Sequence, residues 1–343
     1  MNQREIMVRQ VSRTFALSIE QLPDLLGEAI SIAYLMFRIS DGIEDHPEIP
    51  FARKIALLEQ WAGILEGREK GFELARSVTD LDHDDPEVEV IQETPLILDW
   101  LSALPPAYQE PIIHHVHATT LGMARWQAHG PFVEDEAELD DYMHEVAGRV
   151  GYLVTDLFAL YSPRIEEQRD VLMPLSRECG LALQTVNVIR GIRKDYERGW
   201  VFIPRTYYER AGLNVDMILD PKMSTQALSV VGMLADKADR HLENGLEFVT
   251  KFPRSEHSIR LSLMWPFFFA ARTLAISRNN PDVLTGEAKM TRNEIHRIVA
   301  ETKLFGWSNR WLARYYRQLS EAPPVRTEST VARLSPEAAT ENL

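Results

Sequence analysis

The chain has 343 residues, of which 45% are hydrophobic, and a formal net charge of −14. This length allows a sizeable buried core, whereas the negative field excludes nucleic acid as a partner and favours divalent cations or cationic small molecules. The single cysteine excludes a disulfide framework and suits a reducing, cytoplasmic location.

Apolar residues recur with a helical period along almost the whole chain, and no run alternates as a strand would. The polar N-terminus lacks the apolar core of a signal peptide. The longest apolar stretch, 261–271, is too short to cross a bilayer and predicts a buried helix. We therefore expect an all-α fold with one helical domain over 1–318, a disordered polar tail over 319–343, and at most peripheral membrane contact.

The pattern places the helices between proline and glycine breakers. The predicted helices cover roughly 4–21, 24–45, 51–69, 86–102, 106–129, 136–161, 165–196, 205–211, 224–250, 254–280 and 291–317.

The first stretch that carries chemistry lies near the start of the first predicted helix and reads Ser12-Arg13-Thr14-Phe15. A hydroxyl group at a helix start can cap the backbone or bind phosphate, and an arginine there can bind phosphate as well. Ser12 and Arg13 are therefore candidate substrate-binding residues.

The second stretch is a polar stripe on an apolar helix, because its members recur every three or four residues. The stripe holds Tyr34, Arg38, Asp41 and Asp45. Together with Glu44, the two aspartates are candidate Mg²⁺ ligands, because Mg²⁺ prefers oxygen ligands and is shared with substrate phosphates. Arg38 could bind a phosphate oxygen. A solvated acidic helix end is the alternative, but the apolar residues before the stripe predict a buried helix, in which paired carboxylates need a partner.

The third stretch runs from Asp141 to Gly151 and places Gly148 and Gly151 inside a predicted helix. Each glycine costs up to about 1 kcal/mol relative to alanine in a helix. Small residues at these positions let another helix or a flat apolar ligand approach closely, and both explanations remain open.

The fourth stretch repeats the polar stripe on a later apolar helix, with Gln184, Asn187, Gly191 and Asp195. Such groups are costly on an apolar helix unless they meet a ligand or each other, and both explanations remain open. Asp195 is a further candidate metal ligand. The candidate phosphate ligands of this stretch are Gln184, Asn187, Arg190, Arg193, Lys194 and Arg198.

In this order and spacing the four stretches resemble the squalene/phytoene synthase family, from about residue 10 to 317. The resemblance is closer to squalene synthases and is carried by YLMFRISDGIED, HEVAGRVG and LQTVNVIRGIRKD. It implies an all-α terpenoid-synthase fold around a central cavity, where two acidic motifs bind prenyl diphosphates through Mg²⁺. It also implies head-to-head coupling through a cyclopropyl intermediate, which squalene synthases reduce with NADPH.

Three positions depart from the family pattern. Gly191 stands where the family has an aspartate, and Lys194 stands where it has a glutamate. Glu145 stands where the family has a tyrosine, and the resemblance implies that this tyrosine takes part in proton transfer. The second site should therefore hold less Mg²⁺, and Arg193 and Lys194 could bind a diphosphate directly.

Three functions stay open. In the first, Tyr34, Arg38, Asp41 and Asp45 ionise a farnesyl-type diphosphate, which then couples to a second prenyl diphosphate. In the second, Glu145 acts as a general base or ammonium anchor for an amine or hydroxyl acceptor such as a polyamine; cyclisation or hydrolysis of the prenyl group belongs with this alternative. The third is a non-enzymatic subunit that binds prenyl diphosphate.

Overall fold

The computed structural model describes residues 2–286 and 288–321, apart from the side chain of Arg13. Within these ranges the backbone forms helices and one isolated bridge between Phe132 and Val201, but no strand. The predicted all-α class is therefore confirmed. Of the predicted tail, residues 322–343 lie outside the described part of the chain.

The first half of the chain contains eight helices. These are α1 (Gln3–Val11), α2 (Arg13–Ile19), α3 (Asp24–Asp45), α4 (Phe51–Leu65), α5 (Gly71–Arg76), α6 (Pro86–Gln92), α7 (Thr94–Ala103) and α8 (Pro106–His129). The middle contains α9 (Glu136–Met143), the π-helical turn η1 (His144–Gly148), α10 (Arg149–Tyr161), α11 (Pro163–Glu166), α12 (Arg169–Glu197) and α13 (Arg205–Arg210). The last part contains α14 (Ser224–Lys251), α15 (His257–Ser277), α16 (Arg292–Phe305) and α17 (Asn309–Ser320), with short 3₁₀ turns at Val215–Met217, Pro221–Met223 and Pro281–Thr285.

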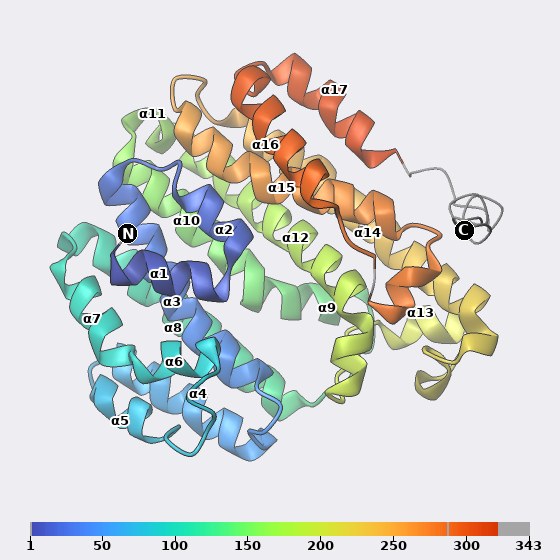
Figure 1. The fold of residues 1–343 in the computed structure, drawn as a ribbon, viewed down its shortest axis with the longest axis horizontal. Coiled ribbons are helices and arrows are strands. Elements are labelled where there is room, and N and C mark those ends of the chain that lie inside the picture. The colour runs from blue at the N-terminus through green and yellow to red at the C-terminus, as the bar shows by residue number, and fades with distance from the viewer. Residues whose placement is uncertain (1, 287, 322–343) are drawn as a thin grey trace, which may run out of the picture.

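The long helix α12 lies at the centre of the fold, against α10, η1, α14 and α15 (Figure 1). Helix α3 packs on α8, α6 and α7 on the other side of the molecule, and α4 packs on α8. Helices α16 and α17 both pack against α15. The acidic ends of α3 and α12 therefore belong to two different layers of helices.

Three of the predicted helices are split in two, each at a residue that caps or breaks the helix. Ser12 is extended, with φ −159° and ψ 107°, and its hydroxyl group accepts a hydrogen bond from the Phe15 amide at 3.1 Å. Glu93 separates α6 from α7, and a proline follows in the first turn of α7. Ser308 caps α17 by accepting a hydrogen bond from the Trp311 amide at 3.3 Å. The side-chain caps at Ser12 and Ser308 compete with helix continuation, which explains why periodicity alone missed these two breaks.

Helix α15 alone among the described helices has the length and hydropathy of a membrane span. However, 78% of its most apolar window is buried among the other helices. It is accordingly a core helix of this fold, as the sequence predicted.

Two glycines let α12 approach the α9–α10 segment backbone to backbone. A Cβ atom on Gly180 would lie 2.5 Å from the carbonyl oxygen of Ala147, and one on Gly151 would lie 2.3 Å from that of Ser176. Neither backbone atom can move aside as a flexible side chain could. The small residues at these positions therefore serve helix packing, which forms one wall of the cavities described below.

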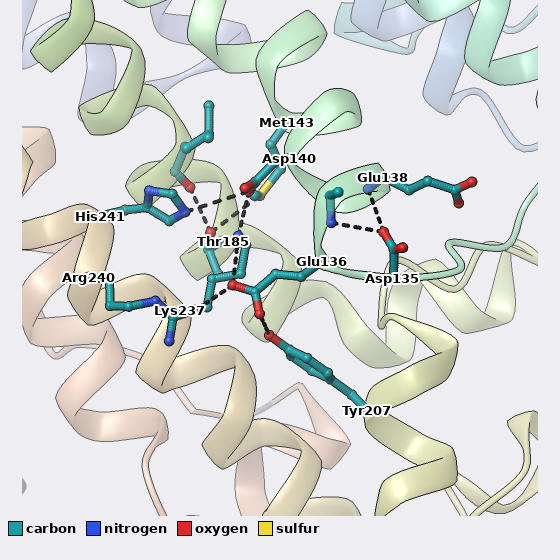
Figure 2. Close-up of polar contacts among 12 residues, drawn as sticks. Asp135, Glu136, Glu138, Asp140, Met143, Thr185, Tyr207, Lys237, Arg240 and His241 are labelled. Carbon is teal, nitrogen blue, oxygen red and sulfur yellow. Dashed lines mark hydrogen bonds and ion pairs between the residues drawn. The ribbon is translucent and has the colours of Figure 1, made fainter.

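A buried charged cluster ties α9 to its neighbours (Figure 2). Lys237 of α14 is 1% exposed, and its Nζ lies 2.5 Å from Asp140 Oδ1 and 3.5 Å from Glu136 Oε1. The Tyr207 hydroxyl donates a hydrogen bond to Glu136. His241 Nδ1 lies 2.7 Å from Glu178 Oε2 of α12. Because a buried cation is costly unless it is paired, these contacts hold α9, and with it η1, in one position.

The close packing of α12 predicts opposite effects for two glycine substitutions. Gly180→Ala should destabilise the protein by about 1–3 kcal/mol, because the new methyl group overlaps the Ala147 carbonyl. Gly232→Ala in α14 should be neutral or stabilising by up to about 1 kcal/mol, because no atom lies within 4 Å of the new Cβ. Urea denaturation of both variants measures this, and equal stabilities would contradict the described contact.

Candidate active site

The polar stripe at the end of α3 is present and lies partly buried. Arg38 Nη1 donates to Asp41 Oδ2 at 3.1 Å, and its other amino group pairs with Glu87 of α6. The apolar face of α3 is buried around this stripe, and Ser40 shares a hydrogen bond of 2.8 Å with Thr120 of α8. In this arrangement two carboxylates already hold the Arg38 guanidinium beside the site.

Burial, together with crowding of negative charge, raises the pKa values of two carboxyl groups here. Burial is the main cause for Asp41, and nearby Asp45 and Glu87 add to it, so its pKa rises to about 6 although Arg38 opposes the shift. Burial, then Asp45 and Asp41, raise the pKa of Glu44 well above its usual range. Gln127 of α8 donates to Glu44 at 3.5 Å. The end of α3 therefore holds more negative charge than its own residues neutralise.

Arg198 connects the two acidic stretches, which are far apart in the sequence. Its guanidinium pairs with Asp45 of α3 and donates to Asp195 Oδ1 of α12 at 2.5 Å. The side chains of Arg198 and Asp195 are 16% and 13% exposed, whereas that of Asp45 is 46% exposed. The structure thus brings Asp45 and Asp195 to opposite sides of one guanidinium group.

An aromatic wall lies beside this bridge. Trp200 stacks on Phe202 at 5.3 Å between ring centroids, and Phe202 stacks on Tyr142 at 4.3 Å. Burial raises the pKa of the Tyr142 hydroxyl strongly, and the charges of Glu44, Asp45 and Asp195 raise it further. The Tyr142 side chain therefore faces both acidic stretches and stays protonated.

Three cavities adjoin each other along α12. The cavity next to α3 measures about 490 Å³, and its walls include Ser12, Phe15, Tyr34, Asn187 and Arg190. The second, about 230 Å³, lies deeper between α2, α10, α12, α14 and α15 and is mainly apolar. Both are lined by Phe15, Ser18, Leu183, Asn187 and Pro266. We name them the outer and the inner cavity.

The third cavity is a basic groove of about 420 Å³ beside the outer cavity. Its cationic residues are Arg190, Arg193, Lys194 and Lys289. Arg193 Nε donates to the Leu284 carbonyl at 2.9 Å, and Arg190 forms no ion pair or hydrogen bond with any residue that the structure describes. The groove is therefore suited to an anion.

The sequence-predicted residues fall into clear groups. Tyr34, Ser12, Gln184 and Asn187 line the outer or inner cavity, and Asn187 donates to Gln184 at 3.3 Å. Asp41 and Asp45 do not line these cavities, but Tyr34, on the same face of α3, lines the outer one. The charges of Arg38 and Asp41 both act on the Tyr34 hydroxyl. The Arg13 side chain lies outside the described part of the chain.

Glu145 is not brought to the other predicted residues. Its carboxylate receives hydrogen bonds from Arg149 Nε at 2.5 Å and Arg125 Nη2 at 3.4 Å. It lies over Gly122 of α8, where a Cβ atom would be 2.4 Å from Glu145 Oε2. The π-helical turn points the neighbouring residues Val146 and Ala147 into the inner cavity instead. This geometry gives Glu145 a paired, structural position and no access to an acceptor in the cavities.

The absence of a side chain at Gly191 leaves space for the carboxylate of Asp195. A Cβ atom on Gly191 would lie 2.7 Å from Asp195 Oδ2, so the remaining aspartate folds back over the glycine. The second acidic stretch consequently presents one carboxylate, already paired with Arg198, together with the cations of the basic groove.

The sequence patterns do not indicate Glu87, Gln127, Lys289 or Tyr142 as members of the site. Glu87 lies in the acidic segment 79–87, whose composition is typical of a solvated loop. Its contact with Arg38 depends on how α6 packs against α3, which no local pattern reveals. Tyr142 alone carried a usable signal, because it lies one turn before the position where the family has its tyrosine.

The oxygen ligands of the site fit Mg²⁺. Three carboxylates at the end of α3 act on one another electrostatically, and a divalent cation would relieve the excess charge that raises the pKa of Asp41. In the described ranges no set of three or more His, Cys, Asp or Glu side chains surrounds a common point. Arg38 and Arg198 pair with Asp41 and Asp45 instead. A metal would therefore be held by Asp41 and Asp45 together with ligands from a bound diphosphate.

Fold and site together define an all-helical protein with two facing acidic segments beside an apolar cavity. The model of the family described as squalene/phytoene synthase matches residues 8–294. This chain therefore belongs to the squalene/phytoene synthase family, as its motifs predicted.

Relatives in this family include enzymes from algae and yeasts. The Botryococcus squalene synthase of Botryococcus braunii is 30% identical over 296 residues, which cover 85% of this chain and 61% of that protein. The squalene synthase of Yarrowia lipolytica is 28% identical over 303 residues, covering 84% of this chain and 64% of that one. This chain spans about three fifths of the length of these relatives.

Two solved structures support the fold. A ligand complex of TcSQS matches with a TM-score of 0.79 at 23% identity, covering 98% of this chain and 92% of that one. A dehydrosqualene synthase in complex with ligand matches with a TM-score of 0.63 at 20% identity, covering 88% and 94%.

The raised pKa of Asp41 predicts that Asp41→Asn increases the thermal stability of the protein at high pH but not at low pH. The folded protein holds the Asp41 proton more tightly than the unfolded chain, whose value is near 3.8, so this stabilising contribution is complete below about pH 4 and is lost as pH rises through about 6. The neutral asparagine should therefore raise the thermal midpoint at about pH 8 without Mg²⁺, and should give no gain near pH 4.

Thermal unfolding at both pH values measures this effect. Asp99→Asn, at an exposed position of α7, is the matched control and should change neither midpoint. A loss of stability in Asp41→Asn at about pH 8 would show that pairing with Arg38 outweighs the burial of the Asp41 charge.

Proposed function

We propose that this protein is a Mg²⁺-dependent prenyltransferase that ionises a farnesyl-type diphosphate and couples it head to head with a second prenyl diphosphate. The observation that carries the proposal is the meeting of Asp45 and Asp195 at Arg198, within one turn of Gly191 and Lys194, which line the basic groove. Family membership supports the same reaction class.

The donor diphosphate belongs at the end of α3 in this proposal. When bound there, Mg²⁺ supplies positive charge that stabilises the departing diphosphate. Asp41 and Asp45 hold the metal, and Arg38, kept in place by Asp41 and Glu87, donates hydrogen bonds to a phosphate oxygen. Arg198 leaves Asp45 for the diphosphate, because a phosphate oxygen offers the same charge-assisted hydrogen bond.

The prenyl chain belongs in the outer and inner cavities. The diphosphate leaves with the electron pair of the carbon–oxygen bond, and the resulting allylic cation must be kept away from water. Apolar walls exclude water there, and the rings of Phe15, Phe158 and Phe248 line the inner cavity. Aromatic faces also stabilise a nearby cation electrostatically.

The second diphosphate belongs in the basic groove. With Gly191 and Lys194 in place of acidic residues, this side holds less metal and more fixed positive charge. Arg190, Lys194 and Lys289 can bind phosphate oxygens directly, and Asn187 adjoins both the groove and the outer cavity. The double bond of this second substrate then attacks the allylic cation, and transfer of a proton to the departed diphosphate closes the cyclopropane ring.

The product is accordingly of the presqualene type, and NADPH is the reductant to be tested for conversion to a squalene-type hydrocarbon. Transfer to an amine or hydroxyl acceptor through Glu145 is not proposed, because Arg149 and Arg125 hold that carboxylate away from the cavities.

Incubation with farnesyl diphosphate and Mg²⁺ should yield a thirty-carbon product, identified by mass spectrometry with and without NADPH. Asp41→Ala and Asp45→Ala should each lower kcat/KM by at least roughly a hundredfold, since a comparable electrostatic deletion costs about 3 kcal/mol. Asp99→Ala in α7 is the control and should keep full activity. Release of farnesol alone would overturn the coupling reaction, and unchanged activity in Asp45→Ala would overturn the assigned metal site.

The basic groove predicts binding of pyrophosphate without metal. Isothermal titration calorimetry in the presence of a chelator should show binding that Arg190→Ala weakens roughly tenfold or more, because charge-assisted hydrogen bonds are lost. Arg210→Ala, at an exposed end of α13, is the matched control and should bind normally. Equal affinities for the wild type and Arg190→Ala would remove the groove from the proposal.

A further inference from the structure

The turn between α16 and α17 carries an apolar tip. Leu304, Phe305 and Trp307 are 66%, 47% and 56% exposed, although they lie within four consecutive residues. Single exposed apolar side chains are ordinary on protein surfaces, but a group of large ones at one turn marks an interaction site.

The backbone beneath this tip is firmly held. Arg260, which is fully buried, donates to the Gly306 carbonyl at 3.3 Å and to Asn309 Oδ1 at 2.6 Å. Asn309 in turn donates to the Thr250 carbonyl at 2.9 Å. The exposed side chains are thus presented by a fixed turn between two helices.

The two helices that flank the apolar tip are basic. Between Arg292 and Arg317 the sequence has six Lys or Arg residues and two Glu residues, and both glutamates pair with arginines. The exposed cationic residues nearest in sequence to the tip are Lys303 and Arg310. Neither forms an ion pair within the described residues, and nor does Arg254 of the adjoining α14–α15 loop. This local charge is opposite to the net charge of −14.

A second apolar corner lies on the same side of the molecule. Leu160 and Tyr161 at the end of α10 are 48% and 39% exposed. The adjacent α11 is tied to the α14–α15 loop, because Ser162 donates to Glu256 at 3.0 Å and Arg164 donates to Ser255 at 2.8 Å. Figure 1 shows α11, this loop and the α16–α17 turn along one edge of the fold.

The inner cavity lies behind this edge. Phe158 of α10, Phe248 of α14 and Leu263 of α15 line the cavity, and each lies within two turns of the helix end at the edge. The edge therefore joins exposed apolar side chains, unpaired cations and the walls of an apolar cavity.

We propose that this edge docks on the surface of a membrane that contains anionic phospholipid. Leu304, Phe305 and Trp307 would enter the region between headgroups and acyl chains, while Lys303, Arg310 and Arg254 would contact lipid phosphates. A lipid surface satisfies both kinds of group at once, and it would bring the inner cavity close to a phase that dissolves prenyl chains. Because the whole molecule is acidic, binding depends on this local basic edge.

Vesicle flotation of the full chain tests the proposal. Vesicles of phosphatidylcholine with phosphatidylglycerol should carry the protein upward, and vesicles of phosphatidylcholine alone should carry much less. Trp307→Ser and Phe305→Ser should each lower the partition coefficient about tenfold, and Arg310→Glu should lower it only on the anionic vesicles.

Phe72→Ser is the matched control, because Phe72 of α5 is 45% exposed, close to the value for Phe305, and lies at a distant part of the fold. Circular dichroism of each variant distinguishes loss of folding from loss of membrane binding. Failure of the wild type to float with anionic vesicles, an equal loss in Phe72→Ser, or a tip that instead mediates self-association in sedimentation velocity would each overturn the proposal. None of these outcomes depends on whether the coupling reaction occurs.

Discussion

The interaction on which the account depends is the bridge from Asp45 through Arg198 to Asp195. Two helices that belong to different layers present carboxylates toward each other, and such an arrangement is unfavourable unless a cation lies between them. In the structure that cation is a guanidinium group. A divalent metal could take over this place between the carboxylates, while the Arg198 guanidinium turns to the diphosphate and the leaving group lies near the cavities.

Close packing of the helices that contain Gly151 and Gly180 makes the cavity wall beside the acidic site rigid. Because α12 touches the α9–α10 segment through Gly180 and Gly151, the inner cavity has a rigid wall on that side. The buried Lys237 ties α9 to α14 through its ion pairs (Figure 2). The charged site and the apolar cavities are therefore built on the same helices. The diphosphate would leave next to the cavity that keeps water away from the allylic cation.

Much of this could be predicted from the sequence, because helical periodicity places residues on a common face. That rule alone was enough to predict the stripe of Tyr34, Arg38, Asp41 and Asp45. The order of the motifs along the chain was enough to predict the family. The rule fails where contacts come from distant segments. Neither the pairing of Glu87 with Arg38 nor that of Arg125 with Glu145 is visible locally. The π-helical turn also shifts the register at Glu145, so a residue expected at the cavity lies against α8. Capping by Ser12 and Ser308 ended helices that the period alone would continue.

The measurement that tests the central claim most directly is a crystal structure with farnesyl thiodiphosphate and Mn²⁺, located by its anomalous scattering. We expect Mn²⁺ bound by Asp41, Asp45 and the thiodiphosphate, with the Arg198 guanidinium moved from Asp45 to the diphosphate. An analogue bound in the cavities while Arg198 still joins Asp45 to Asp195, with no anomalous peak at α3, would contradict it.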